Sequence, residues 1–429
     1  MVPSAGAPDQ ATLVFVNTVA TVTQRPDKSG IRSVAALAAR PAVRECIQWF
    51  TEERRWINDR HLELCRIPAP TFQENRRAEW MAARFREIGC DVRIDRAGNV
   101  VSFLHSNQQT SCVALTAHLD TVLEPRKPED ITLGSDGKFR GPGVADNGAG
   151  LAALLAIAQG IRGTSLSGDL FPFVFLANVG EEGEGNLSGM RYICRPGGLG
   201  SRISSFVVLD GPNLDHITCR ALASRRFEIT LTGPGGHSWS DYGTGNPVHA
   251  LSRAITLFSD LPLLNAPGPR SSFNFGFVEA GTSVNAIPAV ARAKVDLRSE
   301  DAARLDELAS LLTSSVERAI EVENLRASSG RIAAKIREIG SRPGGKLDDS
   351  AAIISHIRTV DAYLKIRSQL DCASTDANIP LSLGMQAVSV GAGGRGGGAH
   401  TAQEWYNPEG RELGLQRILL TLCLLAGLG

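Results

Sequence analysis

The residues that could perform chemistry begin with a histidine and an aspartate in the segment 113–122, VALTAHLDTV. Its first five residues are apolar or favour strands, so they predict a short buried strand over residues 113–117. His118 and Asp120 follow, and side chains two residues apart in an extended segment point to the same side. An imidazole and a carboxylate therefore project together from a strand end, where ligands collect in open α/β sheets.

Further carboxylates and a second histidine follow other strand-like runs or glycine-rich turns. They are Asp146, Glu181, Glu182, Asp210 and His400. Two histidines with several carboxylates form a donor set that suits zinc, or cobalt or manganese in the same geometry. Asp146, Asp210 and one of the two glutamates make three carboxylates, which is more than one zinc needs. If one of these carboxylates bridged two metals ~3.5–4 Å apart, all three would be used. Either Glu181 or Glu182 could then be a ligand, and the other a free general base.

Each of these features also has an ordinary structural explanation when it is taken alone. A single histidine at a strand end is more often structural than catalytic, and adjacent glutamates usually form a solvated turn. The sequence Asp-Asn-Gly at residues 146–148 is a common turn signal. The joint placement of these residues at successive strand ends favours a metal site, but residue chemistry alone leaves both interpretations open.

Composition and charge exclude several classes of function. The chain has 45 basic and 45 acidic residues, so it has no basic field that would hold nucleic acid or an anionic membrane. No run is apolar and long enough to span a bilayer, and residues 1–28 do not resemble a signal peptide. The eight cysteines are scattered without a CxxC pair, which is typical of a reducing compartment. We therefore expect a cytoplasmic protein without nucleic-acid or membrane partners.

The elements that must position these residues alternate between strands and helices. Helices are expected over residues 44–65, 74–88, 151–161, 351–364 and 413–428, and near 190–194. Strands are expected over residues 91–95 and 100–104, which form a hairpin, and over 113–117, 170–178, 206–209 and 387–390. This alternation predicts an α/β fold with a mainly parallel mixed sheet that is covered on both faces.

The pattern of the sequence changes after residue 215. Apolar and polar residues alternate over 227–231, which predicts a strand with one solvated face. The expected elements that follow are a helix at 247–261, strands at 272–278 and 291–297, a helix at 301–324 and a strand at 332–339. This β-α-β-β-α-β order is ferredoxin-like. We therefore expect an inserted domain over residues 217–342, within a discontinuous domain made of residues 1–216 and 343–429.

Six short motifs together resemble the M20 family of metallopeptidases. They are AHLDTV at 117–122, GPGVADN at 141–147, EEG at 181–183, LDG at 209–211, GPGGHS at 233–238 and AHT at 399–401. The resemblance extends from about residue 59 to the C-terminus. The family includes tripeptide and dipeptide aminopeptidases, glutamate-releasing carboxypeptidases and N-acyl amino acid deacylases. It implies a zinc-exopeptidase-like catalytic domain with an inserted α+β domain that acts as a lid and in dimerisation.

The resemblance also implies roles for the motif residues. Asp146 would bridge two zinc ions, with His118 and Asp210 completing one metal site, and Glu182 and His400 the other. Glu181 would be the general base that takes a proton from the bridging water, and Asp120 would orient the His118 ring. The family often has a cis peptide after the bridging aspartate. Here Asn147-Gly148 stands where many members have Met or a second Asp, followed by Lys.

Four further residues could contact the substrate. By the resemblance, His237 would stabilise the oxyanion, commonly from the partner subunit of a homodimer, and Asn285 would assist it. From the residues alone, 233–236 is a turn and His237 an exposed polar side chain. Arg298 could grip a substrate carboxylate with its planar fork or be a surface charge at a strand end. Gly394 lies in the glycine segment 391–398, which is either a flexible loop or a nest of N–H groups for an anionic substrate terminus.

The expected function is dizinc-dependent hydrolysis of an amide bond in short peptides, by an exopeptidase in which Glu181 activates a metal-bridging hydroxide. An N-acyl amino acid deacylase with the same site is the alternative within this chemistry. A metal-free binding protein on the same fold is the alternative from another class, and its expected sign is a lost ligand. Every expected ligand is present, and neither HExxH nor GxSxG occurs to support a zincin or a serine hydrolase.

Overall fold

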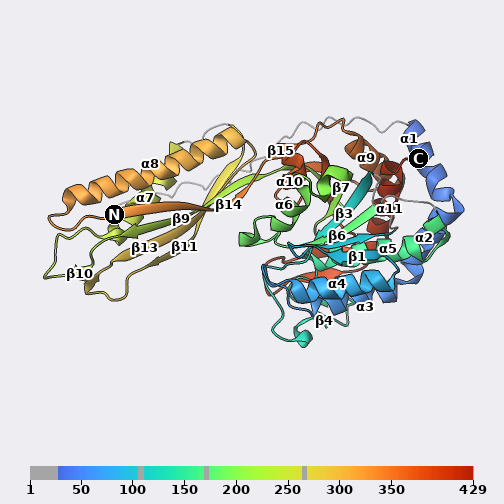
Figure 1. Cartoon of the computed structure of the whole chain (residues 1–429), viewed down its shortest axis with the longest axis horizontal. Coiled ribbons are helices and arrows are strands. Elements are labelled where there is room, and N and C mark those ends of the chain that lie inside the picture. The colour runs from blue at the N-terminus through green and yellow to red at the C-terminus, as the bar shows by residue number, and fades with distance from the viewer. Residues whose placement is uncertain (1–27, 105–110, 169–172, 263–267, 429) are drawn as a thin grey trace, which may run out of the picture.

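The computed structural model describes residues 28–104, 111–168, 173–262 and 268–428. The described chain forms two α/β units that lie next to each other along the long axis of the molecule (Figure 1). Each unit has its own sheet and its own hydrophobic core. We call residues 223–342 the inserted unit and the remainder the larger unit.

The larger unit is built on a nine-stranded mixed sheet. Its strands are β1 Asp91–Ile94, β2 Val100–Phe103, β3 Cys112–His118, β6 Phe173–Asn178, β7 Ile203–Leu209, β8 His216–Ala221, β15 Gly345–Lys346, β16 Gln369–Ala373 and β17 Gln386–Val390. The strand order is β1-β2-β6-β3-β7-β17-β8-β15, and β16 pairs with β8. The four central strands, β6, β3, β7 and β17, run parallel and are almost wholly buried. This confirms the mainly parallel sheet predicted from the sequence.

Helices cover this sheet. They are α1 Lys28–Ala39, α2 Pro41–Glu52, α3 Arg54–Cys65, α4 Asn75–Glu87, α5 Gly148–Arg162, α6 Ser188–Cys194, α9 Ala352–Leu364, α10 Asn378–Ser382 and α11 Arg411–Leu425. The buried helix α5 packs against β3, α3 and α11. Asn147 caps its N-terminus, because the Asn147 side chain accepts a hydrogen bond from the N–H of Gly150. No helix of the described ranges is long and apolar enough to cross a bilayer.

A small second sheet lies beside the large one and joins segments that are distant in sequence. It consists of β4 Thr132–Leu133, β5 Phe139–Arg140, β18 Arg395–Gly397 and β19 Trp405–Asn407. The strand order is β18-β19-β5-β4. This sheet brings the C-terminal glycine segment next to the loop that precedes α5.

The inserted unit has the predicted ferredoxin-like element order. Its elements are β9 Ala223–Thr232, α7 Pro247–Ser259, β11 Ser271–Ala280, β13 Val290–Ser299, α8 Ala302–Arg326 and β14 Ala333–Arg342. The antiparallel strand order is β11-β13-β9-β14, and α7 and α8 pack against the sheet (Figure 1). The side chains of Asn246 and Asp301 cap α7 and α8. A short ribbon of β10 Gly236–His237 and β12 Ala286–Ile287 forms the far tip.

Three expectations about the elements need correction or qualification. The expected boundary at residue 217 falls inside β8, which pairs with β17, β15 and β16 and so belongs to the large sheet. The change of pattern after residue 215 marks a strand that runs antiparallel to β17, and the inserted unit begins only after it. The helix expected over 44–65 is broken at Glu53, where residues 51–55 are all exposed and the Glu53 backbone leaves the helical region with φ −96° and ψ 26°. Of the strand expected over 170–178, residues 170–172 lie outside the described part.

Candidate functional site

Three side chains from three segments meet at the carboxyl ends of the parallel strands. His118 is the last residue of β3, Glu182 follows the adjacent strand β6, and Asp146 lies in the turn before α5. One ligand atom of each lies within 4.8 Å of those of the other two. His118 Nε2 is 3.1 Å from Asp146 Oδ1. Because β3 and β6 are parallel neighbours, their ends place these side chains at one edge of the sheet.

His400 joins this cluster from the C-terminal segment. Its Nε2 lies 3.1 Å from Asp146 Oδ2 and 3.0 Å from Glu182 Oε1. The carboxylate of Asp146 therefore has a histidine at each of its two oxygens. Imidazole nitrogens and carboxylate oxygens are the donors that zinc and similar divalent metals take, so the chemistry of the set fits such a metal.

Asp210 follows β7, the parallel neighbour of β3 on its other side. Burial raises the pKa of its carboxyl to about 7, and the negative charge of Asp146 also raises it. Burial likewise raises the pKa of Glu181 well above its usual value, although Arg342 and His118 oppose this. Several acids buried together are costly unless positive charge lies among them. A divalent metal would supply that charge.

Asp120 supports the site in two ways. His118 Nδ1 donates to the backbone carbonyl of Asp120 at 3.0 Å, which leaves Nε2 free to bind a metal. The Asp120 carboxylate lies 3.5 Å from the same nitrogen. This carboxylate accepts hydrogen bonds from the N–H groups of Glu181 at 3.0 Å and Glu182 at 2.8 Å, and from Thr71 Oγ1 at 2.9 Å. Asp120 thus orients the ring through its backbone and fixes the glutamate turn through its side chain.

Glu404 supports the opposite side of the site and was missed in the sequence. Its buried carboxylate accepts hydrogen bonds from the N–H groups of Gly143 at 2.7 Å, Ala145 at 2.8 Å and Asp146 at 2.8 Å. Glu404 lies four residues after His400, so these hydrogen bonds connect the loop that carries Asp146 to the segment that carries His400. Its position only four residues after the candidate ligand His400 was the signal in the sequence that could have identified Glu404. The peptide between Asp146 and Asn147 is cis, as the family resemblance implies.

Arg342, in the segment GSRPG at residues 340–344, was also missed, because no role was predicted for this arginine from the sequence. Its Nη1 donates to Glu181 Oε1 at 2.9 Å and to Ser374 Oγ at 3.0 Å. Its Nη2 donates to the backbone carbonyl of Glu181. The arginine side chain is only 7% exposed, so the chain brings a buried cation directly to the expected general base.

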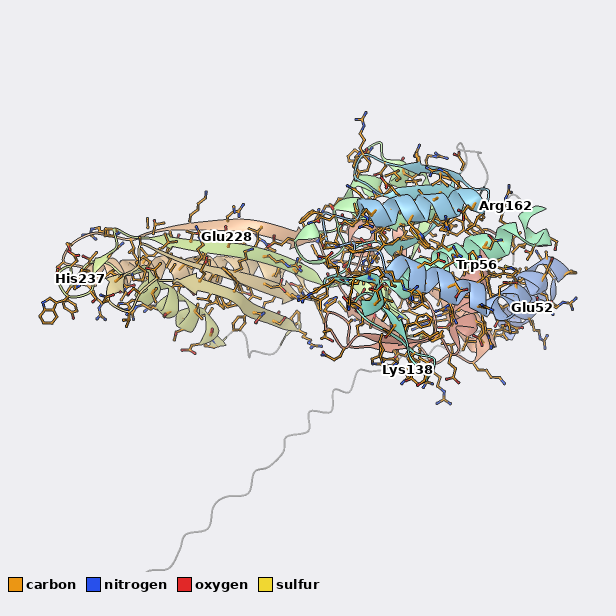
Figure 2. The ribbon with its side chains drawn as sticks, turned by 90° about the horizontal axis from the view of Figure 1, so that it is seen from below. Glu52, Trp56, Lys138, Arg162, Glu228 and His237 are labelled. Atoms are coloured by element: carbon orange, nitrogen blue, oxygen red, sulfur yellow. The ribbon has the colours of Figure 1, made fainter. Side chains whose placement is uncertain are left out.

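The structure does not bring His237 or Asn285 to this cluster within one chain. His237 lies at the end of the inserted unit that is farthest from the larger unit (Figure 2). Asn285 lies beside it, because its carbonyl accepts the N–H of Ser238 at 3.0 Å. Arg298 is on β13, where its Nε donates to Asp296 Oδ2 at 2.7 Å. The four substrate-contact candidates therefore do not share one place in a single copy.

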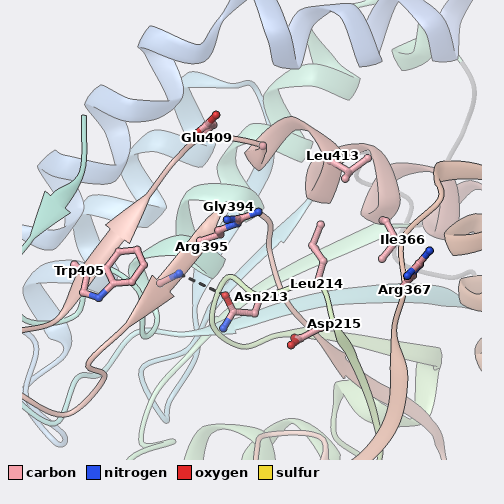
Figure 3. A pocket seen from close by; sticks show the side chains of 12 residues that line it. Asn213, Leu214, Asp215, Ile366, Arg367, Gly394, Arg395, Trp405, Glu409 and Leu413 are labelled. Carbon is pink, nitrogen blue, oxygen red and sulfur yellow. Dashed lines mark hydrogen bonds between the residues drawn. The ribbon is translucent and has the colours of Figure 1, made fainter. Parts of the chain in front are cut away.

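Gly394 lines a cavity of about 720 Å³ next to the ligand segments (Figure 3). Asn213, Arg395 and Trp405 also line it, whereas none of the five candidate ligands is among its described lining residues. A Cβ on Gly394 would lie 2.6 Å from the carbonyl oxygen of Asn407, so packing alone accounts for this glycine. Asn213 Oδ1 accepts the N–H of Gly396 at 3.5 Å, which engages one amide of the expected nest.

The fold and the donor cluster together define a class. A mixed sheet with a parallel centre, an inserted ferredoxin-like unit and histidines with carboxylates at the strand ends characterise α/β metallohydrolases. The sequence profile described as peptidase family M20/M25/M40 matches residues 114–422. The chain belongs to this family and is a hydrolase.

Known proteins with similar sequences or folds agree with this membership. The chain is 23% identical over 365 residues to the uncharacterized protein YqjE of Bacillus subtilis, covering 80% of this chain and 91% of that protein. It is 26% identical over 353 residues to the cytosol non-specific dipeptidase of Escherichia coli, covering 71% of this chain and 63% of the dipeptidase. A tripeptidase from Staphylococcus aureus has a similar fold, with a TM-score of 0.69, 20% identity, and coverage of 87% of this chain and 98% of that one.

Proposed function

We propose that this chain is a metal-dependent exopeptidase that hydrolyses an amide bond of short peptides. The observation that carries the proposal is the Asp146 carboxylate with a histidine at each oxygen and Glu182 beside it. Membership of the M20/M25/M40 family supports hydrolysis of an amide. The similarity to a dipeptidase and to a tripeptidase supports short peptides as the substrates.

The donor set would hold two divalent metals, for which we propose zinc, with cobalt and manganese as alternatives. Asp146 would be shared between them. His118 and Asp210 would complete one site, and Glu182 and His400 the other. Such metals supply Lewis acidity and lower the pKa of a water.

Residues of the chain itself carry out the proton transfers of the reaction. Glu181 takes a proton from the attacking water and delivers it to the leaving nitrogen, for which its buried position beside Glu182 is suited. Asp120 keeps the main chain of Glu181 in place through the hydrogen bond at 3.0 Å. Among the described residues, the Glu181 carboxylate pairs with Arg342 and lies outside the donor cluster, so it is left for proton transfer.

The remaining candidates concern substrate contacts and assembly. His237 and Asn285 lie at the tip of the inserted unit, so we propose that they act on the site of a second copy in a homodimer. Arg298 donates to Asp296 only through Nε among the described residues, which leaves its two Nη groups for a substrate carboxylate. We keep Gly394 as a proposed contact through its place in the cavity wall.

All eight cysteines are free thiols, which supports a reducing compartment such as the cytoplasm.

Metal analysis combined with a substrate panel tests this proposal. We expect about two zinc ions per chain in protein purified without chelator, with activity that is lost on stripping and restored on refilling. The panel pairs di- and tripeptides with N-acetyl and N-carbamoyl amino acids. Turnover of the acylated amino acids alone would replace the peptidase with a deacylase. Absence of both tightly held metal and turnover would favour a binding protein.

A further inference from the structure

The turn that follows β6 is held by the inserted unit as well as by the larger unit. Lys294 Nζ on β13 donates to Glu184 Oε1 at 2.7 Å. The N–H of Ser341 donates to Asn186 Oδ1 at 3.0 Å, and Arg226 on β9 donates to the carbonyl of Gly183. Three strands of the inserted unit therefore contact the segment 183–186, which comes directly after the two glutamates of the site.

Arg342 is the residue of the inserted unit that reaches the functional carboxylate itself. It contacts Glu181 twice, because Nη1 donates to the carboxylate at 2.9 Å and Nη2 donates to the backbone carbonyl. A planar guanidinium that grips the side chain and the main chain of one residue restricts the orientation of that side chain. The third contact, from Nη1 to Ser374 Oγ at 3.0 Å, fixes the arginine from the larger unit.

The position of Arg342 in the chain adds a mechanical argument. It is the last residue of β14, by which the chain leaves the inserted unit, and it pairs with Ser224 at the start of β9, by which the chain enters. Both connections between the units therefore pass this point. Any rotation of the inserted unit relative to the larger unit must be absorbed next to the Arg342–Glu181 ion pair.

We infer that Arg342 is a positioning residue that orients the Glu181 carboxylate and links the orientation of the inserted unit to the proton-transfer step. The inference rests on the proposed function, in which Glu181 is the general base. Arg342 acts through Glu181 and does not touch the scissile amide. A competing role, in which Arg342 releases Glu181 and binds the substrate carboxylate, makes different predictions.

The first test uses the metal-free protein and needs no substrate. Thermal unfolding is measured for Arg342→Ala, Glu181→Gln and the double variant. Removing one partner of a buried ion pair leaves an uncompensated charge or contact, so we expect the two single losses in Tm to add up to clearly more than the loss in the double variant. Additive losses would show that the two side chains are not coupled and would overturn the inference.

The second test separates positioning from substrate binding in the metal-loaded enzyme. For Arg342→Ala we expect kcat to fall about 100-fold, the lower range of a general-base contribution, with KM and metal content close to those of the wild type. Added guanidinium should restore part of kcat in this variant and none in Arg342→Lys, which keeps the charge and loses the fork. Lys294→Ala removes a cation that contacts the same turn from β13 without touching Glu181, and it should keep wild-type kcat.

Two outcomes would contradict the positioning role. A kcat of Arg342→Ala close to that of the wild type would remove it, and a rise in KM without a fall in kcat would assign Arg342 to the substrate. If the wild type hydrolyses no amide at all, the proposed function fails, whereas the unfolding cycle still decides whether Arg342 and Glu181 are coupled.

Discussion

Glu181 and Glu182 are adjacent in sequence and both buried, and their different surroundings support the different tasks that we propose for them. Glu182 contacts His400 at 3.0 Å within the donor cluster, whereas Glu181 contacts Arg342. A carboxylate in the cluster would be taken up by metal, and one outside it keeps its capacity to carry a proton. The sequence alone left open which glutamate is the ligand and which is the base, because two adjacent residues of the same type cannot be told apart without their surroundings.

Glu181→Gln should therefore keep the metals and lose turnover. We expect a fall in kcat of about 10²–10⁴-fold, the usual contribution of a general base, with unchanged metal content by elemental analysis. Glu184→Gln is the matched control, because Glu184 lies in the same turn and its partner is Lys294 outside the site. Near-normal turnover in Glu181→Gln with metals bound would make the base assignment wrong.

Glu404 allows a second prediction at this scale. Glu404→Ala removes the acceptor of three buried N–H groups in the loop 143–146, so we expect a loss in free energy of unfolding of about 2–4 kcal/mol. Because the loop carries Asp146, metal affinity should also fall about 10–100-fold, which metal titration measures. Gln403→Ala, at the exposed neighbouring residue, is the control. Its free energy of unfolding and its metal affinity should stay near those of the wild type. Unchanged metal affinity in Glu404→Ala would show that the loop keeps its shape without this acceptor.

Elements were predicted better than the contacts between them. Short apolar runs ending in polar residues located β3, β6, β7 and β17, because buried parallel strands have a distinct composition. The break at Glu53 and the membership of β8 were not predictable from local pattern, since both depend on packing and strand pairing over long distances. The metal-ligand candidates lie at strand ends or in glycine-rich turns and could be named, whereas Glu404 and Arg342 are recognisable only from the partners that the fold gives them.

The helix α11 gives a prediction at the level of elements. Within it, a Cβ on Gly414 would lie 2.4 Å from the Cα of Gly393, in the glycine segment that leads to His400. Gly160 in α5 faces side chains instead, with Phe50 Cε1 at 2.8 Å. Alanine ordinarily stabilises a helix relative to glycine. A lower free energy of unfolding in a Gly→Ala variant would therefore report the steric clash of the new Cβ.

We expect Gly414→Ala to lower the free energy of unfolding by about 2–3 kcal/mol, because backbone cannot move aside, and Gly160→Ala to lower it by about 1 kcal/mol. Denaturant unfolding of the two variants gives the comparison. Equal losses, or a larger loss for Gly160→Ala, would mean that the glycine segment yields to α11 more easily than its packing indicates.

For the whole molecule, the separation of His237 from the donor cluster predicts complementation between subunits. His237→Ala and Glu181→Gln should each be inactive as pure proteins. If His237 acts on the partner's site, random mixing forms dimers with one complete site, and about a quarter of wild-type activity should return. Glu181→Gln mixed with Asp146→Ala is the control, because both changes lie in the same unit and each partner's defect stays local. Subunit exchange without recovery of activity would place His237 outside the reaction.

The close spacing of the two connections between the units has a mechanical consequence. Ser224 and Arg342 pair across β9 and β14, so both chain connections between the units lie at one place, which is the fulcrum of any rotation between them. The sheet and helices of the inserted unit form one long arm, with the end of β14 at the fulcrum and His237 at the far end (Figures 1 and 2). A rotation about this place that shifted Glu181 by a fraction of an ångström would therefore sweep His237 through a much larger arc, so that the positions of the tip and of the carboxylate would change together.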